Sequence, residues 1–501
     1  MSTVERDAAD AVAASEAAGD GATLIDGFEL VVGLEVHVEL ATATKLFSAS
    51  PNRFGDEPNT NIDPVTLGLP GSLPVLNRRA VELAMRIGLA LHCRVQPCVF
   101  HRKNYFYPDM PKDYQISQYD QPLNVDGWLE LPSGRRIGIE RAHIEEDTGK
   151  STHIGGTGGR LHGSDYSLVD YNRAGVPLVE IVGRPDIRSA EEARQYVNEL
   201  RAILVAIDAS DAKMEEGSMR VDANVSVRRP GEPLGTRCEI KNLNSVRSLG
   251  RAIEYEARRQ IALIADGDAV AQETRHWDED DGRTHTLRTK EEADDYRYFP
   301  EPDLVPLAPD DAWIEEVRAG LPMLPSERRA RLATAAGVDA ADPAVAIAVE
   351  RGRDDLVMDA LRAGGDPARL LVHVEHNLSP EGADPVAARA LADLTRLEVA
   401  GELTPTQAKQ VLADLVDAGG DGDPAALAAA RGFEAMDAGA LMTAVDEAIA
   451  AQSGAWQKYC AGEDKAVGAL VGAVMKATKG QADGKAVTAL LQARRTASTA
   501  S

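Results

Sequence analysis

The sequence predicts a multidomain α+β/α chain, in which a mixed α/β domain is followed by an all-helical region. Between residues 28 and 303, short β-like runs are broken by Gly, Pro, Asn and Asp, with a few helical stretches among them. From about Asp310 onward, Ala- and Leu-rich segments with helical spacing are separated by breakers such as "SPEGADP" and "GGDGDP". A chain of 501 residues has room for roughly three domains of ~150 residues each. We therefore expect a mixed domain over 28–303, a helical domain over 304–425 and a small helical tail over 426–501.

Residues 1–27 differ in composition from the mixed domain that follows. They are acidic and rich in Ala and Gly, and they lack the basic start and apolar stretch of a signal peptide. We interpret them as a disordered extension of a cytoplasmic protein. No apolar run in the chain approaches the ~20 residues needed to cross a bilayer, so we expect no membrane association.

The chain carries a net charge of −26, from 80 acidic and 54 basic residues. This charge argues against a nucleic-acid partner, because phosphate binding needs Lys and Arg. Only 13 of the bases are lysines, however, and we interpret the acidic, Lys-poor composition as adaptation of the surface to high salt. Lysines that remain in polar motifs are then good candidates for function, since a compact ammonium suits a single phosphate contact.

The stretch "GLEVHVEL" (Gly33–Leu40) is predicted to be a strand with one polar face. Its apolar residues alternate with Glu35, His37 and Glu39, so the two sets point to opposite faces of a sheet. Like charges along one face repel each other unless a positive charge lies among them. The polar row is either a solvated face with a Glu–His pair or part of a cation site, and these residues alone leave both open.

Several later segments of the mixed domain repeat this feature. "GVPLVEIVG" holds one carboxylate, Glu180, inside an apolar run, where an unpaired acid is costly. Acidic residues also gather in "HIEEDTGKS", "GSMRVDANVSVR" and "RCEIKNLNS", interleaved with Lys and Arg. Carboxylates with one imidazole suit Mg²⁺, and neighbouring cations suit phosphate oxygens. The sequence thus indicates a site for Mg-ATP and phosphoryl transfer, with a network of structural ion pairs as the alternative.

Two helices are predicted within the mixed domain. "RSAEEARQYVNELRAILVAI" (Arg188–Ile207) opens with Ser189 followed three residues later by Glu192, which is a capping-box pattern. "SLGRAIEYEARRQIALIADG" (Ser248–Gly267) ends at a glycine, as helices often do.

We assign the catalytic role to basic side chains that would act on phosphate groups. These residues are Lys103, Lys150, Arg173 and Lys241. The segment "HRKNYFYPDMPKDYQISQYDQPL" also places tyrosines among cations, in a chain with only 4% aromatic residues. These rings could stack an adenine or the end of a tRNA, and packing in the core is the alternative.

In this order, the motifs resemble the GatB family, the B subunits of aspartyl/glutamyl-tRNA(Asn/Gln) amidotransferases. The likeness covers about residues 28 to 495. The matching stretches include "GLEVHVEL", "RKNYFYPDMPKDYQISQ", "HIEEDTGKS", "DYNRAGVPLVEIV", "MEEGSMRVDANVSVR", "EIKNLNS" and "KEEADDYRYFPEPDL". The chain has no room for the large insertion that the E subunits, the archaeal glutamate-specific relatives, carry after "YRYFPEPDL".

The resemblance implies an α/β cradle (28–303) that acts as kinase and transamidase, a helical domain (304–425) and a YqeY-like tail (426–501) that binds tRNA. The implied enzyme is a carbon–nitrogen ligase with glutamine as amide donor. It would use ATP and Mg²⁺ to phosphorylate the side chain of Asp or Glu misattached to tRNA(Asn) or tRNA(Gln). The A subunit, which is an amidase, would supply ammonia, and the small C subunit would complete the heterotrimer. The alternative is a non-catalytic tRNA-binding subunit of the same complex.

The resemblance also bears on two metal sites, one for Mg²⁺ and one for zinc. It places Glu35, His37, Glu146, Glu180 and Glu239 around Mg²⁺, with Asp222 or Asn224 as a further member. Some relatives bind zinc through four cysteines, but here the matching positions are Ser48, Ser50, Asp63 and Thr66. We expect no zinc, since zinc sites need thiolate or imidazole ligands.

The tail is expected to contact tRNA. From Lys458 to Arg495 the local charge is +4 in a chain of −26. Lys476 and Lys479 stand three residues apart, so they would share a helix face. The residues assigned to tRNA binding are Lys465, Lys476, Lys479 and Lys485. The alternative is that these lysines only complement a helix dipole.

Overall fold

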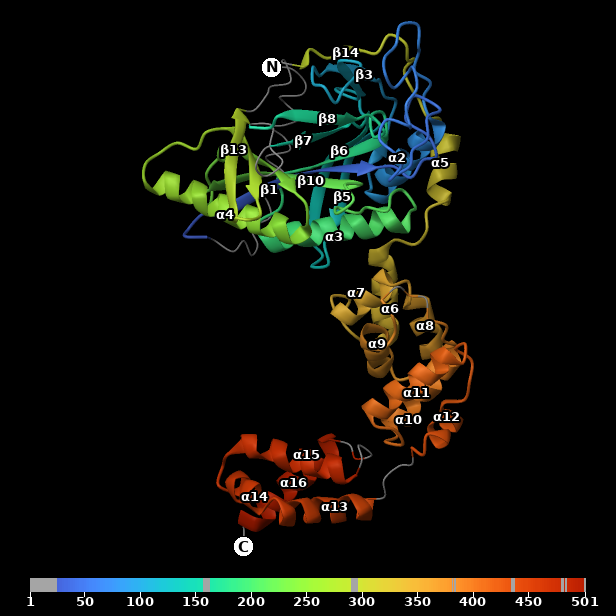
Figure 1. Cartoon of the computed structure of the whole chain (residues 1–501), viewed down its shortest axis with the longest axis vertical. Helices are drawn as coiled ribbons and strands as arrows, with labels where there is room; N and C mark the ends of the chain where they lie inside the picture. Colours follow the sequence, from blue (N-terminus) through green and yellow to red (C-terminus); the bar gives the residue numbers. More distant parts are fainter. Residues whose placement is uncertain are drawn as a thin grey trace. The chain divides into compact units, whose positions relative to one another are not determined.

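The computed structural model describes residues 25–155, 163–289, 296–380, 382, 384–433, 438–478, 482 and 484–499 (Figure 1). The chain forms two compact units, residues 1–325 and residues 326–501. The first contains a mixed sheet and the second contains helices, so the coarse fold prediction is confirmed. Most of the predicted disordered extension, residues 1–24, lies outside the described residues.

A nine-stranded sheet forms the centre of the first unit, and the strand that contains "GLEVHVEL" lies in its middle. Neighbouring strands are antiparallel except for one parallel pair, β11 and β12. The spatial order is β13 (Arg283–Thr289), β12 (Glu273–Asp278), β11 (Cys238–Leu243), β10 (Met219–Arg228), β1 (Glu29–Glu39), β9 (Pro177–Gly183), β6 (Arg136–Glu146), β5 (Asn124–Glu130) and β2 (Arg94–Val95).

Three helices cover one face of this sheet (Figure 1): α2 (Arg78–Ala90), α3 (Ala190–Ala206) and α4 (Val246–Ala265). The predicted start of α3 is confirmed, because the Ser189 side chain accepts a hydrogen bond from the Glu192 backbone N–H. The Glu192 carboxylate reaches back to the N–H of Arg188, one residue before the cap. The first of these bonds satisfies an N–H group that a helix start leaves without a partner.

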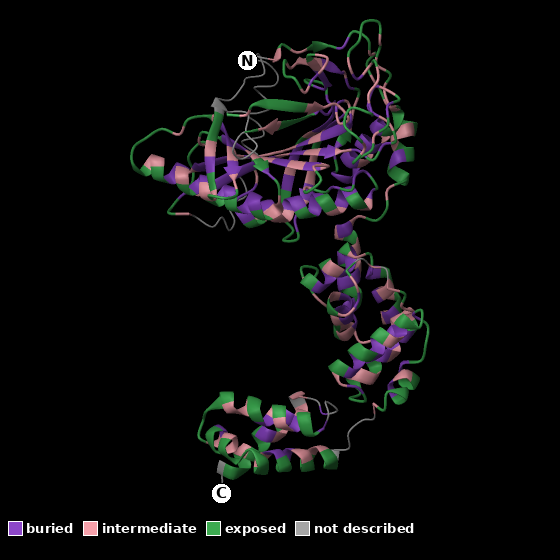
Figure 2. Ribbon diagram, viewed as in Figure 1, coloured by how far each residue is buried: buried purple, intermediate pink, exposed green. Residues whose placement is uncertain are grey.

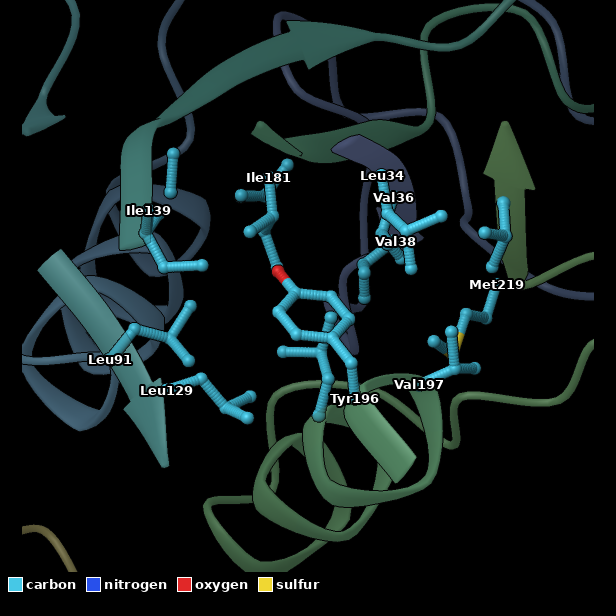
Figure 3. Close-up of a cluster of buried hydrophobic side chains, with 14 of the residues drawn as sticks. Leu34, Val36, Val38, Leu91, Leu129, Ile139, Ile181, Tyr196, Val197 and Met219 are labelled. Carbon is cyan, nitrogen blue, oxygen red and sulfur yellow. The ribbon is translucent and has the colours of Figure 1, made fainter. Parts of the chain in front are cut away.

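The core lies between the sheet and these helices. The apolar row of β1 faces it, and Leu34, Val36 and Val38 are completely buried, as the alternation predicted. Figure 3 shows these side chains around Tyr196 of α3, together with Ile181 of β9. The polar row of β1 therefore points to the other face of the sheet.

Strand β6 contains a β-bulge that changes which of its residues point inward. Ile139 pairs with Gly183 of β9, whereas Arg141 pairs with Val182, so β6 has one extra residue between them. Ile139 lies in the core before the bulge and Ile144 lies there after it. The inward positions of β6 thus change from odd to even residue numbers.

Two smaller sheets complete the strands of the first unit. One has the order β14 (Phe299–Pro300), β3 (His101–Asn104) and β4 (Tyr114–Ser117). The other pairs β7 (Lys150–Ile154) with β8 (Tyr166–Asp170). Figure 1 shows both on the side of the main sheet away from α3 and α4.

The first unit extends beyond residue 303, where the sequence analysis placed a boundary. Helix α5 (Asp311–Ala319) packs against α2, and its Val317 joins the core. Trp313 of α5 also lies under the guanidinium of Arg78, 4.4 Å from the ring centroid. The compact unit ends at Pro325 because this helix buries its apolar side on the sheet domain.

The second unit contains two hydrophobic clusters, whose buried positions run along the inward sides of the helices (Figure 2). The predicted boundary at residue 426 falls inside α12, whose Ala428 belongs to the first cluster. No helix in the described parts of the chain is long and apolar enough to cross a membrane. The helices are α6 (Pro325–Ala336), α7 (Pro343–Glu350), α8 (Asp354–Arg362), α9 (Pro367–His376), α10 (Ala388–Val399), α11 (Pro405–Asp417), α12 (Pro424–Ala430), α13 (Ala438–Ala451), α14 (Ser453–Cys460), the short η3 (Asp464–Ala466), α15 (Val467–Ala477) and α16 (Gly484–Thr499).

Candidate active site

Four strands place polar side chains together on the face of the main sheet opposite the helices. His37 of β1 pairs with Glu180 of β9 on one side and with Arg220 of β10 on the other. Glu180 pairs in turn with His143 of β6. Directly opposed residues of neighbouring strands project to the same face, so these side chains form one row.

The row contains a compact group that we call the carboxylate–imidazole cluster: His37, His143, Glu145 and Glu180. Nε2 of His143 lies 3.2 Å from Glu180 and 3.7 Å from Glu145. Nε2 of His37 lies 3.7 Å from Glu145 and 3.8 Å from Glu180. Ligand atoms of His37, Glu145 and Glu180 all lie within 4.8 Å of one another, so these three residues could hold a metal ion.

Burial and charge compete in setting the pKa values of this cluster. Burial alone would raise the pKa of Glu180, but the charge of His143 holds it well below its usual value. Burial alone would lower the pKa of His143, but Glu180 raises it. The pKa of Glu145 is likewise lowered, against its burial, by His143. The charge of His143 thus favours the ionised form of both carboxylates.

The structure places Glu145 next to His37, whereas Glu146, which was predicted as a ligand, does not face His37. Glu146 lies on the opposite side of β6, where it is fully buried, pairs with Lys112 and accepts a 2.8 Å hydrogen bond from the N–H of Ile116. Adjacent residues of a strand point to opposite faces. Strict alternation from Ile139 would place Glu146 on the polar face, and the bulge in β6 reverses this.

The other two predicted ligands share the polar face but have different partners. Glu35 accepts a 2.9 Å hydrogen bond from the amide of Asn224. Glu239 accepts one from Thr274 at 2.9 Å and lies 3.1 Å from Lys241. Among the described residues, the candidate metal group next to β1 includes His37 and Glu180 of the predicted set but not these two. Asp222, the further candidate, is held by Lys241 at 2.7 Å.

A cavity of about 1060 Å³ lies beside the cluster, over the ends of β1 and β10. Three of the four basic residues assigned to catalysis, Lys150, Arg173 and Lys241, line it. Lys103 does not; its ammonium lies near the cluster, where it helps to lower the pKa values of Glu145 and Glu180. The assigned bases therefore fall into two groups, one at the cavity and one at the cluster.

At the junction of cluster and cavity, the structure adds Asp147 and Arg220, to which the sequence analysis gave no role, to the predicted Arg173. The buried Asp147 carboxylate contacts Nε of Arg173 at 3.2 Å and Nη2 of Arg220 at 3.0 Å. Burial and repulsion by Asp147 raise the pKa of the neighbouring Glu39 to about 8. Arg220 and Glu39 also line the cavity. Their place on the polar rows of β10 and β1 is the signal that could have identified them.

The four positions for which the sequence analysis expects no zinc, Ser48, Ser50, Asp63 and Thr66, form a hydrogen-bonded group. Asp63 accepts a 2.8 Å hydrogen bond from the N–H of Thr66. Burial would raise the pKa of Asp63, but this bond and the hydroxyls of Ser48, Thr66 and Ser50 lower it. These side chains converge on a carboxylate without any thiolate or imidazole.

The residues assigned to tRNA binding are only partly within the described chain. Lys465 lies in η3 and Lys476 in the last turn of α15, and both are exposed. Lys479 lies outside the described residues. Lys485 is part of α16, near its first residue.

Comparison with known proteins gives two family matches and several full-length relatives. A model described as the GatB/GatE catalytic domain matches residues 30–315, and one described as the GatB domain matches residues 371–494. The B subunit of the aspartyl/glutamyl-tRNA(Asn/Gln) amidotransferase of Frankia casuarinae is 51% identical over 490 residues, which cover 93% of this chain and 95% of the relative. Proteins with the same name from Kineococcus radiotolerans and Salinispora arenicola are 49% and 50% identical, over 93% and 94% of this chain and 97% of each relative.

Proposed function

The chain belongs to the GatB family of tRNA amidotransferase B subunits, and we propose that its sheet domain activates the misattached amino acid by phosphorylation. The substrate is Asp-tRNA(Asn), Glu-tRNA(Gln) or both. A side-chain carboxylate oxygen attacks the γ-phosphorus of ATP, and the bond to ADP breaks. Ammonia then attacks the acyl carbon, phosphate leaves, and the amide forms with loss of one proton.

The observation that carries this proposal is the carboxylate–imidazole cluster next to a cavity lined by cations. Its two carboxylates are the donors that Mg²⁺ prefers, and an ion that keeps several waters needs only a few protein ligands. The donor set of Glu145, Glu180 and His37 therefore fits Mg²⁺. Bound there, Mg²⁺ would supply positive charge for the phosphates of ATP.

The two groups of basic residues suggest a division of work. Lys103 lies with the cluster and would contact the phosphates of the nucleotide. Lys150, Arg173 and Lys241 line the cavity, where the amino-acid end of the tRNA would meet the γ-phosphate. Arg220 opposes His37 across the strands and also lines the cavity, so it would reach the transferred group at the boundary between the two.

The proposed assembly is a cytoplasmic heterotrimer with the amidase A subunit and the small C subunit. The relatives described above are named as B subunits, which implies a complex with other subunits. The A subunit would release ammonia from glutamine and deliver it to the activated amino acid on this chain. The exposed lysines of η3 and α15 would contact the tRNA.

The test uses the reconstituted trimer with ATP labelled at the γ-phosphate. We expect phosphate release that depends on misacylated tRNA, and amidation of Asp-tRNA(Asn), Glu-tRNA(Gln) or both will identify the substrate. Two results would contradict the proposal and favour a tRNA-binding role alone. One is amidation without ATP hydrolysis, and the other is ATP hydrolysis at the same rate with and without the misattached amino acid.

We also propose that this chain works without zinc. The group at Ser48, Ser50, Asp63 and Thr66 offers hydroxyls and one carboxylate, which are poor zinc ligands. Elemental analysis of the purified trimer should find less than about one tenth of a zinc ion per chain. One zinc ion per chain would overturn this prediction.

A further inference from the structure

Six of the eleven tyrosines of this chain lie in two short segments, residues 105–119 and 296–298, which the three-stranded sheet brings together. Tyr119 and Tyr298 stack face to face, with centroids 4.4 Å apart and planes at 8°. Tyr296 meets Tyr298 edge-on at 6.2 Å. In a chain so poor in aromatic residues, this concentration beside a charged cluster calls for an explanation other than core packing.

The tyrosine pair lies directly beside the carboxylate–imidazole cluster. The hydroxyl of Ser117, at the end of β4, donates a 3.2 Å hydrogen bond to Glu145. Tyr119 follows two residues later, about 7 Å along an extended chain. Tyr298 lies at the same place, because its ring stacks on that of Tyr119. Two segments distant in sequence thus bring the pair to the same place.

Tyr119 remains partly accessible within the pair. Tyr119 is 47% exposed although one of its faces rests on Tyr298. The buried His101 supports it from a second direction, at 6.2 Å and nearly perpendicular. A partly exposed ring that is held by two neighbouring rings can accept another flat ring with little loss of conformational entropy.

A lysine ammonium lies beside the tyrosines, where the phosphates of a nucleotide stacked on Tyr119 would lie. Lys103, two residues after His101 on β3, places its ammonium 4.6 Å from the centroid of Tyr296 and near Glu145 and Glu180. A base stacked on Tyr119 would therefore have a cation and the proposed Mg²⁺ ligands within the reach of its own phosphate chain. This arrangement favours a nucleotide over an apolar peptide or a lipid.

We propose that the Tyr119–Tyr298 pair is the stacking platform for the adenine ring of ATP at the carboxylate–imidazole cluster. The inference rests on the proposed use of Mg-ATP and adds the residues that hold the base. Stacking acts on the face of a ring and reads no hydrogen-bond pattern, so the platform distinguishes bases weakly. Other purine nucleoside triphosphates should bind within a few-fold of ATP.

The experiment measures binding of a non-hydrolysable ATP analogue to the trimer by calorimetry, with inorganic tripolyphosphate as the probe that lacks a base. Tyr119→Ala and Tyr119→Leu should both weaken the analogue about tenfold, as loss of one base–aromatic stack does. Tyr119→Phe should bind like the wild type. Tripolyphosphate should bind all four proteins equally, because it makes no use of the ring.

The matched control is Tyr166→Ala. Tyr166 lies on β8, is 56% exposed and belongs to a different sheet. Its loss should leave nucleotide binding unchanged, and glutaminase activity and the unfolding temperature should report intact assembly in every variant.

Three outcomes would overturn the inference. The first is that the Tyr119→Ala trimer binds the ATP analogue as tightly as the wild type. The second is that its affinity for tripolyphosphate falls as much as its affinity for the analogue. The third is that only its dissociation constant for tRNA changes. In each of these cases the wild type still binds ATP, so the proposed phosphorylation stands. If the wild-type trimer binds no ATP at all, the proposed function fails and the inference fails with it.

Discussion

In the described residues, the sheet unit and the helical unit each contain a group that combines histidine with glutamate, and the two groups differ in how completely their atoms are paired. In the helical unit, Nε2 of His373 lies 2.7 Å from Glu398 and Nδ1 lies 3.0 Å from the amide of Asn377. The second carboxylate oxygen of Glu398 accepts from Arg369 at 2.5 Å. Every polar atom of the imidazole and the carboxylate has a partner at hydrogen-bond distance.

In the carboxylate–imidazole cluster of the sheet unit the same groups are less completely paired. Its four imidazole–carboxylate distances run from 3.2 to 3.8 Å, and two acids lie together. Within the described chain, the buried Nδ1 of His143 has no hydrogen-bond partner. A network of structural ion pairs, the alternative raised by the sequence, would resemble the His373 group. The looser geometry supports the proposed metal site over such a network.

The largest effect is expected from a substitution within the carboxylate–imidazole cluster. His37→Ala should reduce amidation by about 1,000-fold, about 4 kcal/mol, since it removes a ligand of the proposed metal site. Unfolding should change little, because His37 is partly exposed and its loss leaves no buried group unpaired. Steady-state amidation by the trimer tests this, with glutamine hydrolysis as the control. A wild-type amidation rate in Mg²⁺ would remove His37 from the site.

The next largest effect distinguishes the roles of two adjacent acids, Glu145 and Glu146. Glu146→Gln should lower the free energy of unfolding by about 3 kcal/mol, because it leaves the ammonium of Lys112 buried without its counter-charge. Glu145→Gln should leave stability nearly unchanged and abolish amidation. Denaturant unfolding and amidation of both variants check the pair. If Glu145→Gln lowered the stability and Glu146→Gln abolished amidation instead, Glu146 would be the acid on the polar face.

A smaller effect is expected from the fully paired group. Glu398→Gln should lower the free energy of unfolding by about 2 kcal/mol without changing the amidation rate of folded enzyme. His373 and Arg369 hold the pKa of Glu398 below its usual value despite burial. A carboxylate with a lowered pKa stabilises the fold above its unfolded-state pKa of about 4.3 and loses this effect as the pH falls through its folded-state pKa. The difference between wild type and variant, followed by unfolding from pH 7 to pH 3, should therefore shrink toward zero. A difference independent of pH would mean that the ionised carboxylate is not its source.

The smallest effect concerns the exposed tail, where neither kind of buried group is involved. Lys476→Ala should raise the KM for tRNA about threefold and reduce its dependence on salt, because one phosphate contact is lost. Glutamine hydrolysis should be unaffected. Lys409→Ala, a lysine on α11, serves as the matched control. An unchanged KM across a salt titration would move the tRNA contact away from α15.

The fold was predictable where local patterns decide it. Alternation identified β1, the Ser189 cap identified α3, and the change in composition separated sheet from helices. The position of α5 was not predictable, because its helical pattern is the same whether it packs on the sheet unit or on other helices. Only tertiary contacts, such as those of Val317 and Trp313, assign it to the first unit.

The candidate site was predictable as a set of residue types but not as a contact list. Alternation could place Glu35, His37 and Glu39 on one face, but the order of strands decides that Glu180 and His143 become the neighbours of His37. That order depends on pairing between distant segments, which leaves no local pattern. The same limitation hid the pairing of Lys112 with Glu146.

The bulge in β6 also bears on how this sequence can change over evolution. The bulge shifts the alternation of the strand by one residue. The orientation of the later side chains therefore depends on whether a residue is present at position 140, and little on which side chain Glu140 carries. An exposed position such as this tolerates most substitutions. Its deletion, however, would exchange Glu145 with Glu146 and turn His143 toward the core. The length of this stretch, rather than its composition, is therefore the property that selection on the site must preserve.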